Sequence, residues 1–376
     1  MPTTPSSTAL AAGIQSWIRC ESPSSSPPAI AAMVAIVEQH AMAAGLAAQV
    51  SSLGDTTGPL LHITNRDAGD ARAGILVLGH LDTVHPIGTL QQNACRIEGD
   101  KLFGPGGYDM KGGIYLALTA LGQLSAPGST ALPVDLLLVP DEETGSHASR
   151  ASIERFARHS RYALVGEPAR ADAGKCVTAR KGTGMLRLKV QGRPAHAGVD
   201  HAKGRSAIRE MAHQVLALEA MTDYARGVTV NVGTIRGGTV TNTVPAQCQA
   251  MVDFRVPDME AAADVLARMR ALKPVGADVT LDIDVELNRP PMVKTDAVAR
   301  LLARAQGWAA ESGFTLEEAP MTGGGSDANF TAALGVPTLD GLGADGDGAH
   351  TLTEFILVST LERRLKFWTL LLKNLN

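Results

Sequence analysis

The chain is poor in cysteine, and its cysteines are not spaced as pairs. Only four occur among 376 residues, and none belongs to a C-x-x-C motif. This spacing does not indicate a disulfide framework, so we expect reduced thiols in a cytoplasmic protein. Free cysteine usually packs as a small apolar side chain. We expect that role for Cys20, Cys95, Cys176 and Cys248.

An excess of basic charge and a long apolar run are also missing. The net charge is −4 and the isoelectric point is about 6.2, whereas a nucleic-acid-binding domain is usually strongly basic. No apolar run approaches the roughly 18 residues that span a bilayer. Residues 1–16 lack the charged start and the apolar stretch of a secretory signal. We therefore expect no nucleic-acid partner, no membrane association and a cytoplasmic location.

Length and hydrophobic content indicate more than one core. With 376 residues, 45% of them hydrophobic, the chain is long enough to form two domains. Apolar runs alternate with helical patterns in residues 1–180 and 289–376, which predicts a discontinuous α/β domain. Residues 181–288 instead predict a β-α-β-β-α-β series, typical of a ferredoxin-like α+β domain. The second domain is therefore expected to be inserted into the first.

Hydrophobic periodicity and turn residues place the expected elements. In the α/β domain, helices are expected at 9–18, 30–45, 114–124, 296–312 and 357–375, and strands at 60–64, 75–78, 134–139, 162–165 and 337–339. In the inserted domain, strands are expected at 185–190, 228–235, 247–256 and 279–287, and helices at 205–221 and 259–272.

Three strongly apolar strands run directly into histidine or acidic residues. In chain order, these residues are His80 and Asp82, then Glu142 and Glu143, then Glu167. Charged residues should avoid buried strand ends unless they have partners there. In an open α/β sheet, ligands bind beyond the carboxyl ends of the strands. The pattern therefore indicates one site at that edge of the sheet.

Five side chains form the candidate ligand set of a metal site: His80, Asp109, Glu143, Glu167 and His350. Imidazole and carboxylate ligands suit zinc, and also cobalt or manganese. Five are too many for one tetrahedral ion with an open position, but they fit two ions about 3.5–4 Å apart that share a carboxylate. A lone histidine after a strand is usually structural, and an acidic pair is usually a solvated loop. Their occurrence at successive strand ends favours the metal site.

The adjacent acids Glu142 and Glu143 indicate hydrolysis rather than binding alone. A binding site needs one carboxylate here, whereas a hydrolase needs a second one to take a proton from water. Metal binding lowers the pKa of water to about 7, so a nearby carboxylate can act as general base. We expect Glu142 in that role, and Asp82 as the residue that orients a ligand ring or the base.

In this order, the motifs resemble the signature series of the co-catalytic zinc amidohydrolases of metallopeptidase clan MH. They are His80-Leu81-Asp82-Thr83-Val84, Gly106-Gly107-Tyr108-Asp109-Met110-Lys111-Gly112, Asp141-Glu142-Glu143-Thr144-Gly145-Ser146, Gly166-Glu167-Pro168 and the late His350. That family includes glutamate carboxypeptidase, acetylornithine deacetylase, succinyl-diaminopimelate desuccinylase and the aminoacylases. The resemblance implies a zinc-peptidase-like α/β/α catalytic domain, residues 1–180 and 289–376. Residues 181–288 would then form an inserted ferredoxin-like lid and dimerisation domain.

The resemblance also implies roles for single residues. Two Zn2+ ions per subunit would be bridged by Asp109, with His80 and Glu167 on one ion and Glu143 and His350 on the other. Glu142 would be the general base and Asp82 its orienting partner. The segment Pro194-Ala195-His196-Ala197-Gly198 resembles the lid motif of the family. His196 would therefore be an oxyanion donor, often supplied by the partner subunit of a homodimer.

The lid sequence looks most like the glutamate carboxypeptidase branch. By that resemblance, the substrate contacts would be Lys175, Asn242, Arg255 and Arg289, with backbone N–H groups of Gly324 and Gly325. Arginine suits a carboxylate because its planar fork binds both oxygens. Alternatively, Arg255 is a structural strand residue and Arg289 is a linker charge. Additional charges beside the motifs, at Arg180, Lys181, Arg193, Asp345 and Asp347, leave the substrate less defined than the chemistry.

We therefore expect a metallohydrolase that releases a C-terminal amino acid, glutamate or a similar acidic residue, from a small N-acyl or peptide substrate. An N-acyl amino acid deacetylase, similar to acetylornithine deacetylase or an aminoacylase, is the alternative. A metal-stabilised binding protein would leave Glu142 without a role, and a serine hydrolase would carry a G-x-S-x-G motif, which is absent. The histidines expected on the surface or in helices are His85, His147, His159, His201 and His213.

Overall fold

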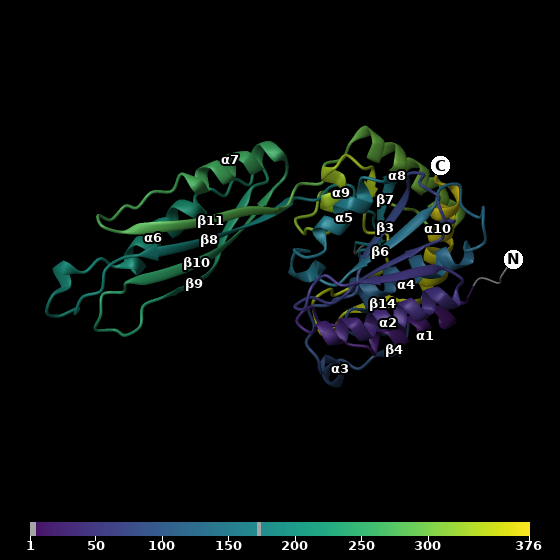
Figure 1. Ribbon diagram of the computed structural model, residues 1–376, viewed down its shortest axis with the longest axis horizontal. Helices are drawn as coiled ribbons and strands as arrows, with labels where there is room; N and C mark the ends of the chain where they lie inside the picture. Colours follow the sequence, from purple (N-terminus) through teal and green to yellow (C-terminus); the bar gives the residue numbers. More distant parts are fainter. Residues whose placement is uncertain (1–4, 171–173) are drawn as a thin grey trace. The chain divides into compact units, whose positions relative to one another are not determined.

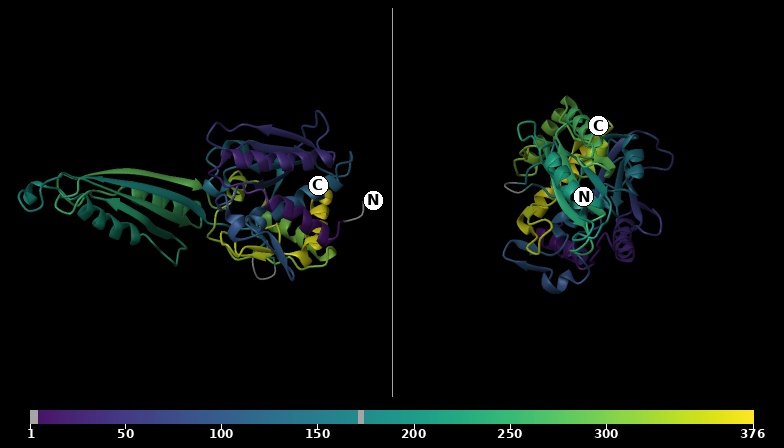
Figure 2. Two further views of the ribbon diagram at one scale, coloured as in Figure 1. Left: turned by 90° about the horizontal axis from the view of Figure 1, so that it is seen from below. Right: turned by 90° about the vertical axis from the view of Figure 1, so that its left-hand side faces the viewer.

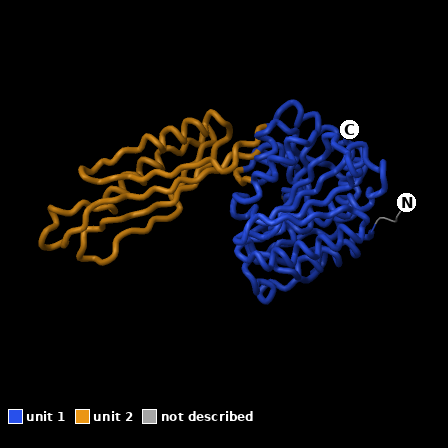
Figure 3. Tube along the Cα trace, viewed as in Figure 1, with its two compact units in different colours: residues 1–179, 294–322, 326–376 blue, residues 180–293, 323–325 orange. Residues whose placement is uncertain are grey.

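The protein, seen here in a computed structural model that describes residues 5–170 and 174–376, divides into two compact units (Figures 1 and 3). Unit 1 comprises residues 1–179, 294–322 and 326–376, and unit 2 comprises residues 180–293 and 323–325. Most of the buried apolar residues belong to one of two clusters, and each unit contains one of them. Each unit therefore has a hydrophobic core of its own.

Unit 1 is built on a six-stranded sheet with the strand order β1-β2-β6-β3-β7-β12. Its strands are β1 (Ala47–Ser51), β2 (Leu60–Thr64), β3 (Gly74–His80), β6 (Val134–Val139), β7 (Ser160–Val165) and β12 (Thr338–Leu339). Strand β3 pairs in parallel with β6 and β7, and β12 pairs in parallel with β7. Strands β3 and β6 are buried along their whole length, as expected for apolar strands covered on both faces.

Helices cover both faces of this sheet. One face packs on α1 (Ser7–Ile18), α2 (Pro27–Ala43), α4 (Gly112–Gln123), α8 (Asp296–Glu311) and α10 (Leu361–Asn374), which share a core with alternate strand residues. Figure 2 shows α2, in purple, alongside β1 and β2. Helices α5 (Arg150–Ala157) and α9 (Ala328–Ala333) contact β7. The ring of Phe156 in α5 packs against His62, whose side chain lies on the opposite face from the core residue Ile63.

A second sheet of unit 1 joins segments that lie far apart in the sequence. It has the order β13-β14-β5-β4, and all its pairs are antiparallel. Its strands are β4 (Arg96–Glu98), β5 (Lys101–Phe103), β13 (Gly346–Asp347) and β14 (Phe355–Leu357). Strand β5 leads into the glycine-rich turn 104–111, and β13 and β14 flank the loop 348–354. The pairing of β5 with β14 therefore brings that turn and that loop side by side.

Unit 2 is an antiparallel sheet with the order β11-β8-β10-β9 and two helices. Its elements are β8 (Gly182–Gln191), α6 (Ala207–Glu219), β9 (Thr229–Gly237), β10 (Gln247–Val256), α7 (Met259–Arg270) and β11 (Thr280–Arg289). Alternate residues of β8 and β10 are buried against the helices. Ser206 and Asp258 cap α6 and α7, because their side chains accept backbone N–H groups of the first turns. This is the ferredoxin-like arrangement.

The α/β domain and the inserted ferredoxin-like domain are confirmed, and most elements lie within a few residues of their expected bounds. The helix expected at 357–375 begins only at Leu361, because Phe355–Leu357 pairs with β5 as a strand. Several short elements were not predicted from the sequence. They are β1, α3 (Thr89–Gln92), β4, β5, α5, α9, β13 and β14. Most of these are shorter than one or two periods of a hydrophobic pattern, so periodicity could not reveal them.

The boundaries of unit 2 differ from the expected ones by a few residues, and a separate short turn also belongs to it. Residues 323–325 belong to unit 2, although the sequence placed them in the catalytic domain. Arg180 and Arg255 of unit 2 donate hydrogen bonds to carbonyl oxygens of this turn, which explains the difference. The rest of unit 2, residues 180–293, lies close to the expected 181–288.

In the described part of the chain, none of the helices has both the length and the apolar character needed to span a membrane. All four cysteines are free thiols. Cys176 and Cys248 are buried, as expected, whereas Cys20 and Cys95 are only partly buried.

Candidate metal centre

The candidate site lies where the parallel strands of unit 1 end. His80 is the last residue of β3, Glu142 and Glu143 follow β6, and Glu167 follows β7. Because β3 lies between β6 and β7, these segments are neighbours at the carboxyl edge of the sheet. One ligand atom from each of His80, Asp109 and Glu143 lies within 4.8 Å of the others. The same holds for His80, Glu142 and Glu167.

The ring of His80 is held with one nitrogen facing the site. The residue is only 1% exposed. Its Nδ1 lies 2.8 Å from the carbonyl oxygen of Asp82, an atom that can only accept, so Nδ1 carries a proton. Nε2 is therefore the nitrogen that can present a lone pair, and it lies 3.1 Å from Asp109 Oδ1 and 3.9 Å from Glu167 Oε1. A histidine oriented in this way is suited to bind metal through Nε2.

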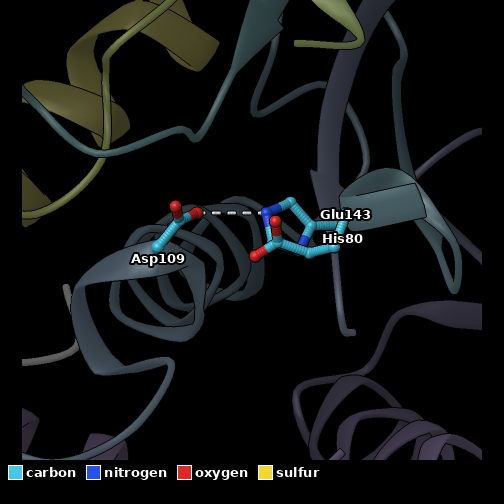
Figure 4. A group of neighbouring side chains, drawn as sticks. All are labelled: His80, Asp109 and Glu143. Carbon is cyan, nitrogen blue, oxygen red and sulfur yellow. Dashed lines mark hydrogen bonds and ion pairs between the residues drawn. The ribbon is translucent and has the colours of Figure 1, made fainter. Parts of the chain in front are cut away.

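Asp109 lies between the two candidate imidazoles. Its Oδ1 is 3.1 Å from Nε2 of His80, a contact drawn as a dashed line in Figure 4. Its Oδ2 is 3.2 Å from Nε2 of His350. The two oxygens of one carboxylate thus face different imidazoles, which suits a carboxylate that bridges two cations. The preceding turn contains Gly106 at φ 68, a conformation that glycine adopts without strain.

His350 lies on the more open side of the site. Its Nε2 is 3.2 Å from Glu143 Oε2 as well as 3.2 Å from Asp109 Oδ2. The residue belongs to the loop between β13 and β14 and has a φ of 64, which residues with side chains seldom adopt outside functional or tightly held segments. Its side chain is 53% exposed, whereas that of His80 is 1% exposed. Solvent therefore reaches the site from the His350 side.

Asp82 organises the acidic turn that follows β6. Its two carboxylate oxygens accept the backbone N–H groups of Glu142 at 3.2 Å and Glu143 at 3.1 Å. The hydroxyl group of Ser24 donates a third hydrogen bond at 2.6 Å. Asp82 is 1% exposed, and burial raises the pKa of its carboxyl group to about 6. One side chain thus connects the His80 segment to the turn with the two glutamates.

The site concentrates negative charge in a buried volume. Burial and neighbouring acids raise the pKa of Glu143 to about 7, and that of Glu167 well above its usual value. Burial acts in the same direction on Asp109, but hydrogen bonds from His350 and His80 lower its pKa. Hydrogen bonds to Asp109 and Glu143 raise the pKa of His350 to about 10. Protons thus balance the carboxylates, and metal ions displace such protons when they bind.

The residues present fit a pair of divalent metal ions. Oε1 of Glu143 is buried and has no hydrogen-bond partner in the described part of the chain, a state that a bound cation would relieve. Two candidate ligands lie on each side of the bridging position: His80 and Glu167 on one, and Glu143 and His350 on the other. Imidazole and carboxylate ligands suit zinc, cobalt or manganese.

Two predicted site residues belong to neighbouring segments of unit 2. The N–H group of Ala197 donates to the carbonyl oxygen of Asn242 at 2.9 Å, so Asn242 lies beside the His196 segment. Nδ1 of His196 accepts the N–H group of Gly198 at 3.2 Å. In the neutral ring the proton is therefore on Nε2, which makes Nε2 a hydrogen-bond donor. The side chains of His196 and Asn242 are exposed.

The predicted arginine contacts gather around the glycine turn 323–325 in unit 2. Arg255 donates to the carbonyl oxygen of the first glycine at 3.4 Å, and Arg180 donates to that of the second at 2.9 Å. A Cβ atom on the third, Gly325, would lie 2.9 Å from Cδ of Arg289, so a larger residue would clash there. Arg180 and Arg289 are both 4% exposed. The turn and three guanidinium groups therefore form one basic cluster.

Two of the predicted contacts already have acidic partners. Nε and Nη2 of Arg255 bind the two carboxylate oxygens of Asp253 at 2.8 and 2.7 Å. The fork of Arg255 is thus occupied, which favours a structural part for this residue over direct contact with substrate. Lys175, which belongs to unit 1, has its Nζ 3.4 Å from Glu317 Oε2. Nη1 of Arg289 donates to Asn288 Oδ1 at 2.9 Å.

Sequence reasoning missed two residues that shape the site. Glu354 is fully buried, and it accepts the backbone N–H group of Asp109 at 2.9 Å. His85, expected to be a surface or helix histidine, is instead 7% exposed, with Nε2 2.9 Å from Glu354 Oε2. Its burial next to a carboxylate explains the difference. The other histidines expected on the surface are exposed, and they are His147, His159, His201 and His213.

Comparison with known proteins gives consistent matches over most of the chain. The profile of Peptidase family M20/M25/M40 matches residues 76–374. Carboxypeptidase G2 of Pseudomonas sp. (strain RS-16) is 31% identical over 309 residues, which cover 81% of this chain and 74% of the relative. Acetylornithine deacetylase of Myxococcus xanthus is 31% identical over 282 residues, which cover 69% of this chain and 72% of the relative.

A solved structure shows the same fold. Aminopeptidase PepT from Bacillus cereus superposes with a TM-score of 0.77 at 23% identity, and the match covers 98% of this chain and 99% of that one. The profile match and the two relatives show the family and the class of reaction, which is hydrolysis. Members of the family bind metal ions, typically zinc, in agreement with the cluster of histidine and acidic residues. This chain therefore belongs to peptidase family M20/M25/M40 and is a hydrolase.

Proposed function

We propose that this protein is a dizinc-dependent hydrolase that releases a C-terminal amino acid from a small N-acyl or peptide substrate. One observation carries the proposal. The two oxygens of Asp109 face different imidazoles, at 3.1 Å and 3.2 Å, beside a turn that offers two further carboxylates. A single-metal binding site would need neither a bridging carboxylate nor a second glutamate.

In this proposal, the five candidate ligands are assigned to two metal ions according to which side chains lie next to one another. His80 and Glu167 would hold one ion, Glu143 and His350 would hold the other, and both ions would share Asp109. When bound, the ions supply Lewis acidity at the scissile carbonyl and lower the pKa of a water molecule to about 7. The hydrogen bond from Nδ1 of His80 to the Asp82 carbonyl keeps Nε2 turned toward the site.

The remaining steps belong to side chains that move protons or donate hydrogen bonds. Glu142 takes a proton from the attacking water and later gives it to the leaving amine. Asp82 fixes the backbone of the Glu142 turn, so the base stands in a defined position. His196 donates from Nε2 to the oxygen that becomes negative in the transition state. The acceptor bond at its Nδ1 supports this assignment, because it leaves the proton on Nε2.

We further propose that the released residue is acidic, glutamate or a close analogue. The basic cluster of Arg180, Arg255 and Arg289 around the turn 323–325 supports an anionic group. The likeness to carboxypeptidase G2 supports the release of a C-terminal residue. One charge-assisted hydrogen bond contributes about 1.5–3 kcal/mol, enough to favour such a group by one to two orders of magnitude. Lys175, Asn242 and the backbone of Gly324 and Gly325 are the other proposed contacts.

The second candidate is an N-acyl amino acid deacetylase that uses the same metal centre. The likeness to acetylornithine deacetylase supports it. The pairing of Arg255 with Asp253 also favours it, because the pair leaves less positive charge for an acidic group. The two candidates differ in the amine that they release, not in the chemistry at the metal centre.

A substrate panel on zinc-loaded protein separates the two candidates. The panel holds N-acyl glutamates, aminobenzoyl-glutamate, acetylornithine, succinyl-diaminopimelate and neutral N-acyl amino acids, and the released amine is quantified. We expect kcat/KM to be highest for the glutamates. Preference for basic or neutral amines would contradict the acidic leaving group and support the deacetylase, and no turnover of any amide would contradict both.

We also propose a cytoplasmic homodimer that associates through unit 2. Strand β9 is an edge of the unit 2 sheet, and its Ile235 is 51% exposed. An unpaired edge with exposed apolar side chains is a common route to association. The free cysteines agree with a reducing compartment. Sedimentation at micromolar concentration should give the mass of two chains, and a monomer there would contradict the proposal.

A further inference from the structure

Glu354 is a buried carboxylate, and each of its two oxygens lies within hydrogen-bond distance of two groups. It is 0% exposed. Its Oε1 accepts the backbone N–H groups of Tyr108 at 2.8 Å and Asp109 at 2.9 Å. Its Oε2 accepts the backbone N–H group of Gly106 at 3.0 Å and lies 2.9 Å from Nε2 of His85. The three backbone partners are donors, and the imidazole of His85 is a fourth donor when its proton is on Nε2.

These four contacts join three segments of the candidate metal centre. Gly106, Tyr108 and Asp109 form the turn that carries the bridging carboxylate. His85 lies five residues beyond His80, on the segment that leaves strand β3. Glu354 itself ends the loop that carries His350. One side chain therefore connects the segments of His80, Asp109 and His350.

The small sheet of unit 1 explains why Glu354 reaches this turn. Strand β14 starts at Phe355, directly after Glu354, and pairs with β5, which directly precedes the turn. The N–H group of Gly104 also donates to the carbonyl oxygen of Glu354 at 3.3 Å. The register of two short strands thus sets the carboxylate against the backbone of the turn. The contact does not depend on a long side chain reaching across solvent.

We propose that Glu354 is a positioning residue, which sets the bridging carboxylate of Asp109 against His350 and so tunes the affinity of the metal pair. The inference rests on the proposed metal roles of Asp109 and His350. Its basis is the hydrogen bond from the Asp109 N–H group to Oε1 of Glu354, because this bond fixes the backbone from which the bridging carboxylate extends. Glu354 acts through Asp109 and does not contact the substrate.

The substitution Glu354→Gln tests this role with little change in shape. The glutamine side chain would have an NH2 group in place of one carboxylate oxygen, and this group would face an existing hydrogen-bond donor. Either the turn or His85 therefore loses its acceptor. We expect the variant to fold, and zinc titration of the metal-free protein by calorimetry to show at least one of two equivalents bound at least tenfold more weakly. The visible spectrum of the cobalt-loaded variant should also change. Glu362→Gln, an exposed glutamate eight residues further on, should bind both equivalents as the wild type does.

A pair of substitutions at His85 tests the same contact from the side of the imidazole. This pair replaces the first test if Glu354→Gln does not fold. His85→Gln keeps an N–H donor toward Glu354, whereas His85→Leu removes it. We expect His85→Leu to weaken zinc binding and His85→Gln to restore most of it. Activity of the weakened variants should recover at excess zinc, which a general loss of folding would not allow.

The outcomes separate this inference from the proposed function. If the wild type binds fewer than two zinc ions, the dizinc proposal fails and the role of Glu354 fails with it. If the wild type binds two ions and Glu354→Gln binds both with unchanged affinity and an unchanged cobalt spectrum, the positioning role fails alone. A lower melting temperature with intact metal binding would make Glu354 a purely structural residue.

Discussion

At the scale of single residues, Glu142 and Glu143 show how neighbours in the sequence take different environments. The N–H groups of both bind the carboxylate of Asp82. The side chain of Glu143 then contacts His350, whereas a ligand atom of Glu142 lies close to His80 and Glu167. A single hydrogen-bonded turn thus presents both carboxylates to the candidate centre.

Replacement of Glu142 by glutamine should separate metal binding from turnover. Glutamine keeps the size of the side chain but cannot take a proton from water, and general-base catalysis typically contributes about 10²–10⁴-fold in rate. We expect kcat to fall within that range while zinc content, measured by elemental analysis, stays at the wild-type value. The exposed Glu362→Gln serves as the matched control. Wild-type turnover with full zinc content would remove Glu142 from the role of base.

The candidate ligands could be named from the sequence, because most of them follow an apolar strand that periodicity reveals. Glu354 could not be named in this way. Three of its four partners are backbone N–H groups of a turn up to 248 positions earlier in the chain, and a backbone N–H group does not depend on the type of residue that carries it. The pairing of Arg255 with Asp253 was hidden for another reason. Both residues are on one strand, but only the structure shows that their side chains meet.

At the scale of secondary-structure elements, a partly buried ion pair joins the segment after strand β2 to strand β6. Asp135 of β6 is 4% exposed. Arg66, just beyond β2, donates to its two carboxylate oxygens at distances from 2.6 to 3.0 Å, and Nε2 of His62 lies 3.0 Å from Oδ1. Burial alone would raise the pKa of Asp135, but the hydrogen bonds from His62 and Arg66 lower it.

Replacement of Asp135 by asparagine should destabilise unit 1 because the partly buried Arg66 would lose its counter-charge. Breaking such a pair typically costs about 3–5 kcal/mol. Since the folded pKa of Asp135 lies below the unfolded value of about 3.9, its contribution is fully present above that pH and is lost as pH falls through the folded pKa. Urea unfolding at pH 7 and at pH 3 measures both effects. The difference between wild type and variant should shrink at pH 3.

The exposed Asp67→Asn provides the control, because it removes a carboxylate one residue beyond Arg66 without breaking a buried pair. It should change the free energy of unfolding by less than about 0.5 kcal/mol. Equal effects of Asp67→Asn and Asp135→Asn, or a difference between wild type and Asp135→Asn that grows at low pH, would contradict the assignment.

Elements also mark the limit of sequence reasoning. Long apolar strands such as β3, β6 and β10 could be placed to within a residue or two, because burial on one or both faces constrains many positions. Strands β13 and β14 have only two and three residues. Their existence depends on pairing with β5, which is remote in the sequence. The pairing of β14 with β5 also places His350 next to Asp109. The sequence could therefore predict the candidate ligands but not how the strands bring them together.

At the scale of the whole molecule, the chain holds two separate cores. One buried cluster includes Leu136 of unit 1, and the other includes Leu188 of unit 2. All five candidate ligands belong to unit 1. Metal binding should therefore stabilise one unit and leave the other unchanged.

Removal of metal by a chelator should lower only one of two thermal transitions. A ligand present at 100 times its dissociation constant stabilises its host by about 2.7 kcal/mol, so two zinc ions should raise the midpoint of unit 1 by several degrees. Scanning calorimetry with zinc and with chelator measures the change. Leu136→Ala and Leu188→Ala, each expected to cost about 2–5 kcal/mol, identify the transitions of unit 1 and unit 2. Equal shifts of both transitions on chelation would contradict independent units.

The backbone pairing of Arg180 with Met292, in which each N–H group donates to the other carbonyl at 2.9 and 3.0 Å, has a consequence for the order of folding. Strand β12 must find β7 across the whole of unit 2. Once unit 2 has folded, its two ends lie together. The loop that must close for β12 to pair with β7 is then effectively less than half as long. Each halving of a loop lowers its closure cost by about 0.6 kcal/mol. The folded inserted unit therefore lowers the entropic cost of forming the sheet that carries the candidate metal centre.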